Sequence, residues 1–151
     1  MVRRDTATDL LGGLLAGAVV VRRCARCGST AHGRPLVVGG RHVVSVSYTD
    51  RWVVAAVAPS SFASTIGVDA EDDDGRIDLA RVLPAPSDLH AWTRVEATVK
   101  ADGRGLALDP AAVTVEEVPG GFLSQVERTV YRGWDAPAPP GVVASLVLRR
   151  A

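Results

Sequence analysis

Three carboxylates and one amine stand at spacings that would bring them together. Asp69 and Glu71 lie two residues apart in a stretch of β character, so both side chains point to one face of a strand. Glu96 and Lys100 lie four residues apart in a stretch of helical character, again on one face. Carboxylate oxygens are ligands of Mg²⁺, and an ammonium group suits a phosphate. The set therefore predicts a site for a divalent metal, a phosphate group and a proton transfer.

Lys100 is the only lysine of the chain, and the other sixteen basic residues are arginines. A lysine can give up its proton near neutral pH, whereas a guanidinium group cannot. We therefore interpret Lys100 as a proton donor, beside the alternative that it is a solvated charge near a helix end. The two carboxylates of the strand are also compatible with an ordinary charged surface, and Glu96 with Lys100 is also compatible with an ordinary helical ion pair.

The elements that must position these side chains are a strand over residues 64–70 and a helix over residues 88–101. Gly103 ends the helix, and Pro84 and Pro86 precede it. Strands in succession, interrupted by single helices, favour an α+β fold over a wound parallel sheet. The apolar patterns predict the other elements as a helix over 5–16 and strands over 18–21, 42–48, 51–58, 112–118, 122–130 and 142–148.

The length of 151 residues fits a single domain, and 47% hydrophobic with 23% charged residues fits a globular chain. The net charge of zero argues against bulk attraction to nucleic acid or to a membrane. Charge is nevertheless divided, because residues 1–60 carry eight Arg and three Asp, a net of +5, and residues 61–151 carry a net of −5. This division suits an anionic ligand bound beside a metal.

An apolar run over residues 10–21 is too short to span a bilayer. Arg22 and Arg23 follow it where a signal peptide would have a small-residue cleavage site. We therefore expect a cytoplasmic protein.

Cys24 and Cys27 form a CxxC pair that is followed by His32. A structural zinc site usually has four ligands, and the chain contains only these two cysteines. Two alternatives stay open at this point: a three-ligand zinc site, or a pair of reduced cysteines in a tight turn beside Gly28.

Four segments of the chain share an order and a composition that are found together in one known family. They are Arg22-Arg23-Cys24-Ala25-Arg26-Cys27-Gly28-Ser29 with His32-Gly33-Arg34-Pro35; Ser45-Val46-Ser47-Tyr48-Thr49; Gly67-Val68-Asp69-Ala70-Glu71; and Trp92-Thr93-Arg94-Val95-Glu96-Ala97-Thr98-Val99-Lys100 with Gly103-Arg104-Gly105-Leu106. Over roughly residues 19–109, the chain resembles the surfactin-type 4'-phosphopantetheinyl transferases.

The resemblance implies a single domain over residues 1–151 with two small pseudo-symmetric lobes, approximately 1–62 and 63–151, each with an antiparallel sheet and a helix. It also implies an activity, the Mg²⁺-dependent transfer of the 4'-phosphopantetheine arm of coenzyme A to a serine of an acyl or peptidyl carrier protein. Adenosine 3',5'-bisphosphate is the product that leaves.

The resemblance assigns roles to individual residues of this sequence. The metal ligands would be Asp69, Glu71 and Glu96, and the catalytic residues would be Glu96 as the base and Lys100 beside the leaving phosphate. The residues that bind coenzyme A would be Arg34, Arg22 or Arg23, and Ser47, Tyr48 and Thr49.

Three departures from the family pattern are visible. Tyr48 stands where the family usually has histidine, and Val95 stands where a lysine usually precedes the glutamate, with Arg94 as a neighbouring charge. Only twenty residues separate Glu71 from Trp92, whereas the family has a longer segment. A catalytically degenerate relative that binds coenzyme A or a protein partner is therefore the alternative function. A small zinc-binding interaction module built on the CxxC pair is a third.

Overall fold

The computed structural model describes residues 2–24, 26–83 and 88–151 and shows an α+β protein whose strand pairs are all antiparallel. The predicted fold class is confirmed at this level. In chain order the elements are α1 (Val2–Leu14), β1 (Val20–Arg23), β2 (Arg34–Val37), β3 (His42–Tyr48), β4 (Val53–Pro59), β5 (Ala63–Asp72), α2 (Leu79–Val82), α3 (Leu89–Asp102), the 3₁₀ turns η1 (Gly105–Ala107) and η2 (Pro110–Ala112), β6 (Val113–Val118), β7 (Gly121–Val126), β8 (Thr129–Ala136) and β9 (Val142–Arg150).

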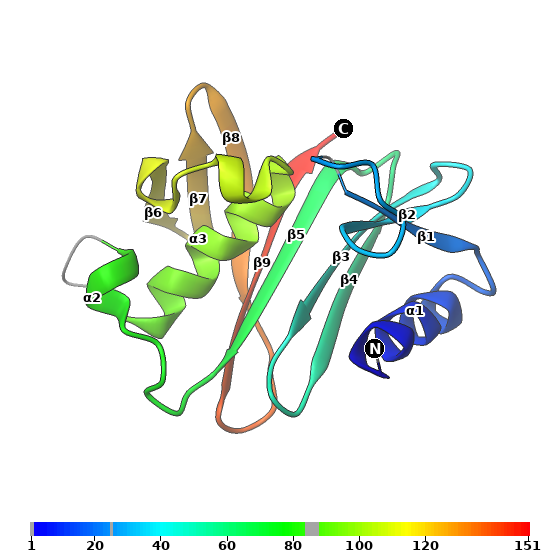
Figure 1. The fold of residues 1–151 in the computed structure, drawn as a ribbon. Helices are drawn as coiled ribbons and strands as arrows, with labels where there is room; N and C mark the ends of the chain where they lie inside the picture. Colours follow the sequence, from blue (N-terminus) through cyan, green and yellow to red (C-terminus); the bar gives the residue numbers. More distant parts are fainter. Residues whose placement is uncertain (1, 25, 84–87) are drawn as a thin grey trace.

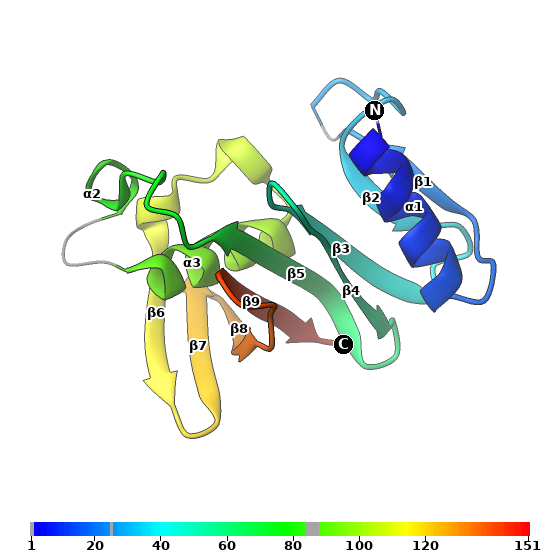
Figure 2. The ribbon, with the colours of Figure 1, turned by 90° about the horizontal axis from the view of Figure 1, so that it is seen from below.

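A five-stranded sheet in the order β5-β9-β8-β7-β6 forms the larger part of the molecule. Helix α3 packs against one face of this sheet, and the β3–β4 hairpin lies beside β5 at the edge (Figures 1 and 2). Helix α1 packs on the hairpin, away from α3, next to the small β1–β2 hairpin. The described residues form four apolar clusters: one beneath α3, one between α1 and the β3–β4 hairpin, and two smaller ones along the β5–β9 pair.

Helix α3 begins and ends within one residue of the predicted bounds. The Asp88 side chain accepts a hydrogen bond from the Ala91 amide at 2.8 Å, and Gly103 takes a left-handed conformation with φ of +88°. Val95 and Val99 on its apolar face are buried in the core with Phe122. Pro84 and Pro86, expected before the helix, lie outside the described residues.

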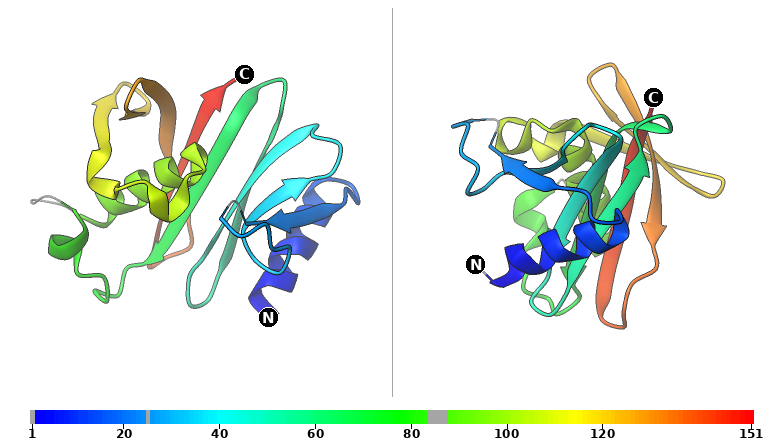
Figure 3. Two further views of the ribbon diagram at one scale, coloured as in Figure 1. Left: turned by 45° about the horizontal axis from the view of Figure 1, so that its top comes forward. Right: turned by 90° about the vertical axis from the view of Figure 1, so that its right-hand side faces the viewer.

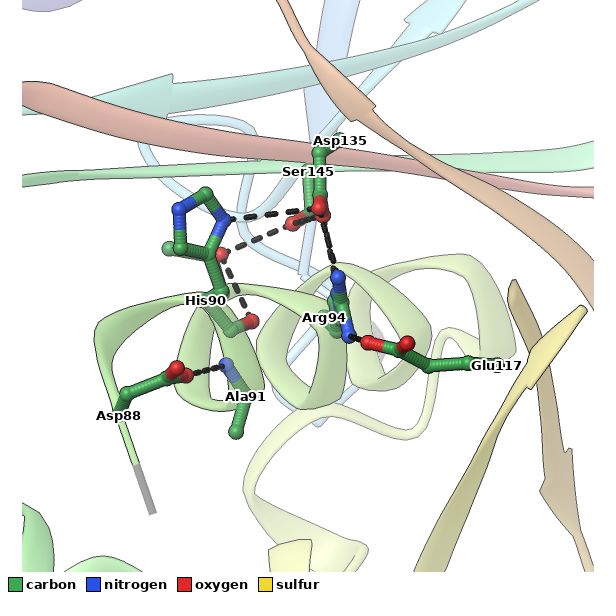
Figure 4. A network of polar contacts seen from close by, with 8 residues as sticks. Asp88, His90, Ala91, Arg94, Glu117, Asp135 and Ser145 are labelled. Atoms are coloured by element: carbon green, nitrogen blue, oxygen red, sulfur yellow. Dashed lines mark hydrogen bonds and ion pairs between the residues drawn. The ribbon is translucent and has the colours of Figure 1, made fainter. Parts of the chain in front are cut away.

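A polar clamp holds the N-terminal half of α3 on the sheet. Arg94 donates two hydrogen bonds to Asp135 on β8, at 2.9 and 2.6 Å, and one to Glu117 on β6 at 2.9 Å (Figure 4). Its guanidinium also lies 5.1 Å from the centre of the Phe122 ring. Arg94 therefore anchors the helix on the sheet.

The predicted strand over residues 122–130 is wrong in one respect, because the chain reverses within it. Strands β7 and β8 form a hairpin in which Val126 pairs with Thr129, and Glu127 adopts a positive φ of +53° in the turn. Strand β2 and most of β8 were not predicted, and α1 starts and ends earlier than expected. Within the described residues, no helix has the length and apolar character needed to span a bilayer.

Candidate functional site

The site begins with a close approach between α3 and β5. A β-carbon at Gly67 would lie 1.9 Å from the carbonyl oxygen of Ala97 and 2.6 Å from the amide nitrogen of Ala101, so only glycine allows this contact. Asp69 and Glu71 follow at intervals of two on the same face of β5. The backbone contact at Gly67 thereby brings the strand carboxylates to Glu96 and Lys100 of the helix.

Asp69 is the centre of the cluster and is only 4% exposed. Its Oδ1 accepts hydrogen bonds from Lys100 Nζ at 2.7 Å and from Ser47 Oγ at 3.0 Å. Its Oδ2 is also buried and accepts no hydrogen bond from any residue that the structure describes. Leaving a buried carboxylate oxygen without a partner costs free energy of folding. This oxygen is therefore suited to bind a cation.

Glu71 and Glu96 complete the carboxylate cluster. Burial raises the pKa of both side chains, and the negative charge of Asp69 raises the pKa of each further. Lys100 acts in the opposite direction on both, and the Trp92 Nε1 donates a hydrogen bond to Glu71 at 3.3 Å. Three mutually repelling carboxylates face one ammonium group, which leaves negative charge that a divalent cation would neutralise.

The described conformation holds the carboxylates around Lys100. The ligand atoms of Asp69, Glu71 and Glu96 do not all lie within 4.8 Å of one another, whereas those of another described group, Cys24, Cys27 and His32, do. A magnesium ion commonly keeps several water ligands and needs few carboxylates from the protein, so the three ligand atoms need not all converge on it. The residue types and the unpaired Asp69 oxygen therefore fit Mg²⁺.

Two serines join β3 to β5 where a backbone ladder would otherwise run. The amide of Val68 donates to Ser45 Oγ at 3.0 Å, and the amide of Ala70 donates to Ser47 Oγ at 3.2 Å. Both serines are buried, and the Ser47 hydroxyl also accepts from Lys100 Nζ at 2.9 Å. Ser45 was not among the predicted site residues, although the alternating Ser-x-Ser pattern already placed both hydroxyls on one face.

The predicted coenzyme A ligands divide into two groups. Arg22 donates to the Tyr48 hydroxyl at 2.8 Å, so these two residues are brought together, while Arg23 is exposed at the next position of β1. Arg34 reaches the C-terminal end of α3, where its Nη1 lies 3.1 Å from the position of a β-carbon on Gly103.

The other two predicted ligands are occupied within the fold. Ser47 binds Asp69 and Lys100, and Thr49 Oγ1 accepts hydrogen bonds from the amides of Arg51 and Trp52 in the β3–β4 turn. Ser47 therefore positions side chains where β3 meets β5, and Thr49 fixes the β3–β4 turn.

An open pocket of about 200 Å³ lies beside Glu71. Half of its lining residues are acidic, and Arg76 forms ion pairs with Asp50 and Asp74. The Asp72 Oδ2 accepts a hydrogen bond from the Asp50 amide at 2.7 Å. The complete lining is Tyr48, Thr49, Asp50, Glu71, Asp72, Asp74, Arg76 and Ile77.

No protein-family model matches the chain, and no curated protein is significantly similar to it.

Proposed function

We propose that the protein transfers the 4'-phosphopantetheine arm of coenzyme A to a serine of an acyl or peptidyl carrier protein, with Mg²⁺ as the cofactor. The observation that supports this most directly is Asp69, a buried carboxylate with one oxygen on Lys100 and the other unpaired. Glu71 and Glu96 beside it supply the remaining carboxylates that a magnesium ion and a proton acceptor require.

Each residue has a distinct part in this reaction. Asp69, Glu71 and Glu96 would hold Mg²⁺, which when bound neutralises charge on the diphosphate of coenzyme A. Glu96 accepts the proton of the attacking serine hydroxyl, a role favoured by the raised pKa of its side chain. Lys100 presents its ammonium group to the leaving phosphate, and Ser47 fixes the position of that ammonium.

We further propose that the two parts of the chain, approximately residues 1–62 and 63–151, are the pseudo-symmetric lobes implied by the resemblance. The seam made by Ser45 and Ser47 between β3 and β5 supports a site at their junction. Arg22 and Arg34 from the first lobe would bind phosphates of coenzyme A. The protein would act in the cytoplasm, without a membrane or nucleic-acid partner.

A binding-only relative is the second candidate, and one observation favours it. Lys100 already forms an ion pair with Asp69, so the cluster is partly satisfied without a cation. Such a protein would bind coenzyme A through Arg22, Tyr48 and Arg34 and transfer nothing.

A transfer assay distinguishes the two candidates. The protein is incubated with coenzyme A, Mg²⁺ and a panel of apo carrier proteins, and the carriers are weighed by mass spectrometry. We expect the mass of one phosphopantetheine arm on a carrier, lost with Asp69→Asn and kept with Asp73→Asn, which changes an exposed carboxylate on the same acidic segment. Coenzyme A binding without a mass change on any carrier would favour the binding-only function. Full activity of Asp69→Asn would overturn the metal assignment.

A further inference from the structure

The loop that joins β1 to β2, described at residues 24 and 26–33, gathers two thiols and an imidazole at the protein surface. Cys27 Sγ lies 3.4 Å from His32 Nε2, and the ligand atoms of Cys24, Cys27 and His32 all lie within 4.8 Å of one another. Cys27 and His32 are exposed and Cys24 is half-buried, so packing in a core does not explain them.

The backbone of the loop is built to bring these side chains together. The Gly28 amide donates to the Cys24 carbonyl and the Cys24 amide donates to the Ser29 carbonyl, both at 2.9 Å. Gly28 has a φ of +72°, which folds the CxxC turn back on itself. At the other end of the loop, a β-carbon on Gly33 would lie 2.5 Å from the backbone of Arg23, so only glycine lets the chain close beside Cys24.

The contacts within the turn place hydrogen-bond donors around one of the sulfurs. Backbone N–H groups of Cys27 and Arg26 donate to the Cys24 sulfur. Such N–H donors support metal-bound sulfur from the second coordination shell. A disulfide between the two cysteines would leave the approach of His32 to Cys27 without a function.

We propose that Cys24 Sγ, Cys27 Sγ and His32 Nε2 bind a zinc ion, with a water molecule as the fourth ligand. Two thiolates and one imidazole are ligands that zinc accepts in tetrahedral geometry. Among the described residues, no further histidine, cysteine or carboxylate joins these three ligands. The fourth coordination position is therefore left for water. Binding releases one proton from each cysteine that is a thiol beforehand, and no oxidation state changes.

Zinc would fix a loop that has no apolar core of its own. The loop ends directly at Arg34, and Arg22 donates to the Gly33 carbonyl at 3.3 Å. Figures 1 and 3 show the loop extending from the β1–β2 hairpin toward the C-terminal end of α3. A metal at this place would hold both arginines in position, although its binding does not depend on transferase activity.

Metal content and cobalt spectroscopy test the site. The full chain is reduced, supplied with Zn²⁺, dialysed and analysed for metal, with Cys27→Ser, His32→Ala and the control His42→Ala, whose histidine lies outside the loop, treated alike. We expect about one zinc per chain in wild type and His42→Ala and loss of retained zinc in Cys27→Ser. We expect Co²⁺ to give thiolate-to-metal charge-transfer absorption that changes in His32→Ala. No zinc uptake by the reduced wild type, or unchanged uptake by Cys27→Ser, would overturn the proposal.

Proteolysis gives a second readout that does not require the variants to bind metal. Arg26 is exposed between the two cysteines, so trypsin can cleave after it. We expect added zinc to slow this cleavage in wild type and not in Cys27→Ser, with cleavage at sites outside the loop unchanged. Equal cleavage rates after Arg26 with and without zinc, in reduced wild-type protein, would count against a loop fixed by metal.

Discussion

The chemistry of the cluster depends on one residue whose two oxygens lie in different environments. Asp69 is neutralised at one oxygen by Lys100 and is unpaired at the other. Because Lys100 supplies a single positive charge for three carboxylates, the cluster keeps an excess of negative charge in a partly buried place. Such an arrangement is costly for folding and useful for binding a cation.

Glu96→Gln should separate the contribution of this carboxylate to transfer from its cost to folding. Loss of the base is expected to reduce the rate of transfer by about 10²- to 10⁴-fold. The same change should stabilise the metal-free protein at neutral pH, because the folded state raises the pKa of Glu96 and so disfavours the ionised side chain. The gain should be full above the raised pKa and should vanish as the pH falls below about 4.3, where the glutamate is protonated in both states.

Thermal unfolding of wild type, Glu96→Gln and Glu116→Gln across this pH range is the measurement. Glu116 is exposed on β6, so its substitution should change stability little at any pH. A stability gain for Glu96→Gln that grows on acidification would contradict the assignment, since it has the opposite sign.

At the scale of elements, the approach of α3 to β5 is what assembles the site. Gly67→Ala places a methyl group where the backbone of Ala97 and Ala101 already lies, so the helix must move. We expect a loss of about 1–3 kcal/mol in the free energy of unfolding and a larger proportional loss of transfer activity. Chemical denaturation measures the first and the carrier assay the second.

Gly12→Ala is the matched control for this substitution. Gly12 lies within α1, and a β-carbon there would meet nothing within 4 Å. Because alanine favours a helix over glycine, this change should stabilise the protein by about 0.5–1 kcal/mol. Equal effects of the two substitutions would mean that the contact at Gly67 does not set the position of α3.

The clamp shown in Figure 4 should have a pH dependence opposite to that of Glu96. Hydrogen bonds from Arg94 lower the pKa of Asp135, so its ionised form is favoured in the folded state. That contribution is present above the ordinary aspartate pKa and is lost as the pH falls through the lowered value. Asp135→Asn should therefore destabilise the protein at pH 7 and cost progressively less on acidification. Urea unfolding at several pH values checks this, and a cost that is constant with pH would count against the clamp.

The sequence predicted the elements whose ends are set by local chemistry. Asp88 and Gly103 mark helix α3 because capping is a property of a few neighbouring residues. The β7–β8 turn was missed because Glu127 and Arg128 are not typical turn residues. The sequence could not explain why residue 133 on β8 is glycine. The reason is the Phe122 ring, whose atoms lie 2.2 Å from where a β-carbon on Gly133 would be.

The same distinction separates the site residues that the sequence could and could not assign. Spacing alone placed Asp69 with Glu71 and Glu96 with Lys100, because each pair lies on a single element. The pairing of Arg22 with Tyr48, and of Ser45 with β5, joins residues more than twenty positions apart. Such contacts depend on how the hairpins pack, which no local pattern records.

At the scale of the whole molecule, a cation from the first part of the chain lies near a cation of the second part, at the C-terminal end of α3. Arg34 extends from β2 to Gly103, and Lys100 stands one turn earlier on the same helix. A ligand with several phosphates would therefore contact both parts at once, with Mg²⁺ completing the acidic side. Coenzyme A has this character, so it should stabilise the folded chain as a unit.

Arg34→Ala tests this coupling, with Arg41→Ala as the control, because Arg41 is an exposed arginine of the same part of the chain. A charge-assisted hydrogen bond contributes about 1.5–3 kcal/mol, so we expect the dissociation constant for coenzyme A to rise roughly tenfold to a hundredfold in Arg34→Ala. Titration calorimetry measures it, and the thermal shift produced by coenzyme A with Mg²⁺ should shrink in parallel. Arg41→Ala should bind as wild type does. Equal affinities of wild type and Arg34→Ala would place the phosphates elsewhere, whereas equal losses in both variants would reduce the effect of Arg34 to net charge.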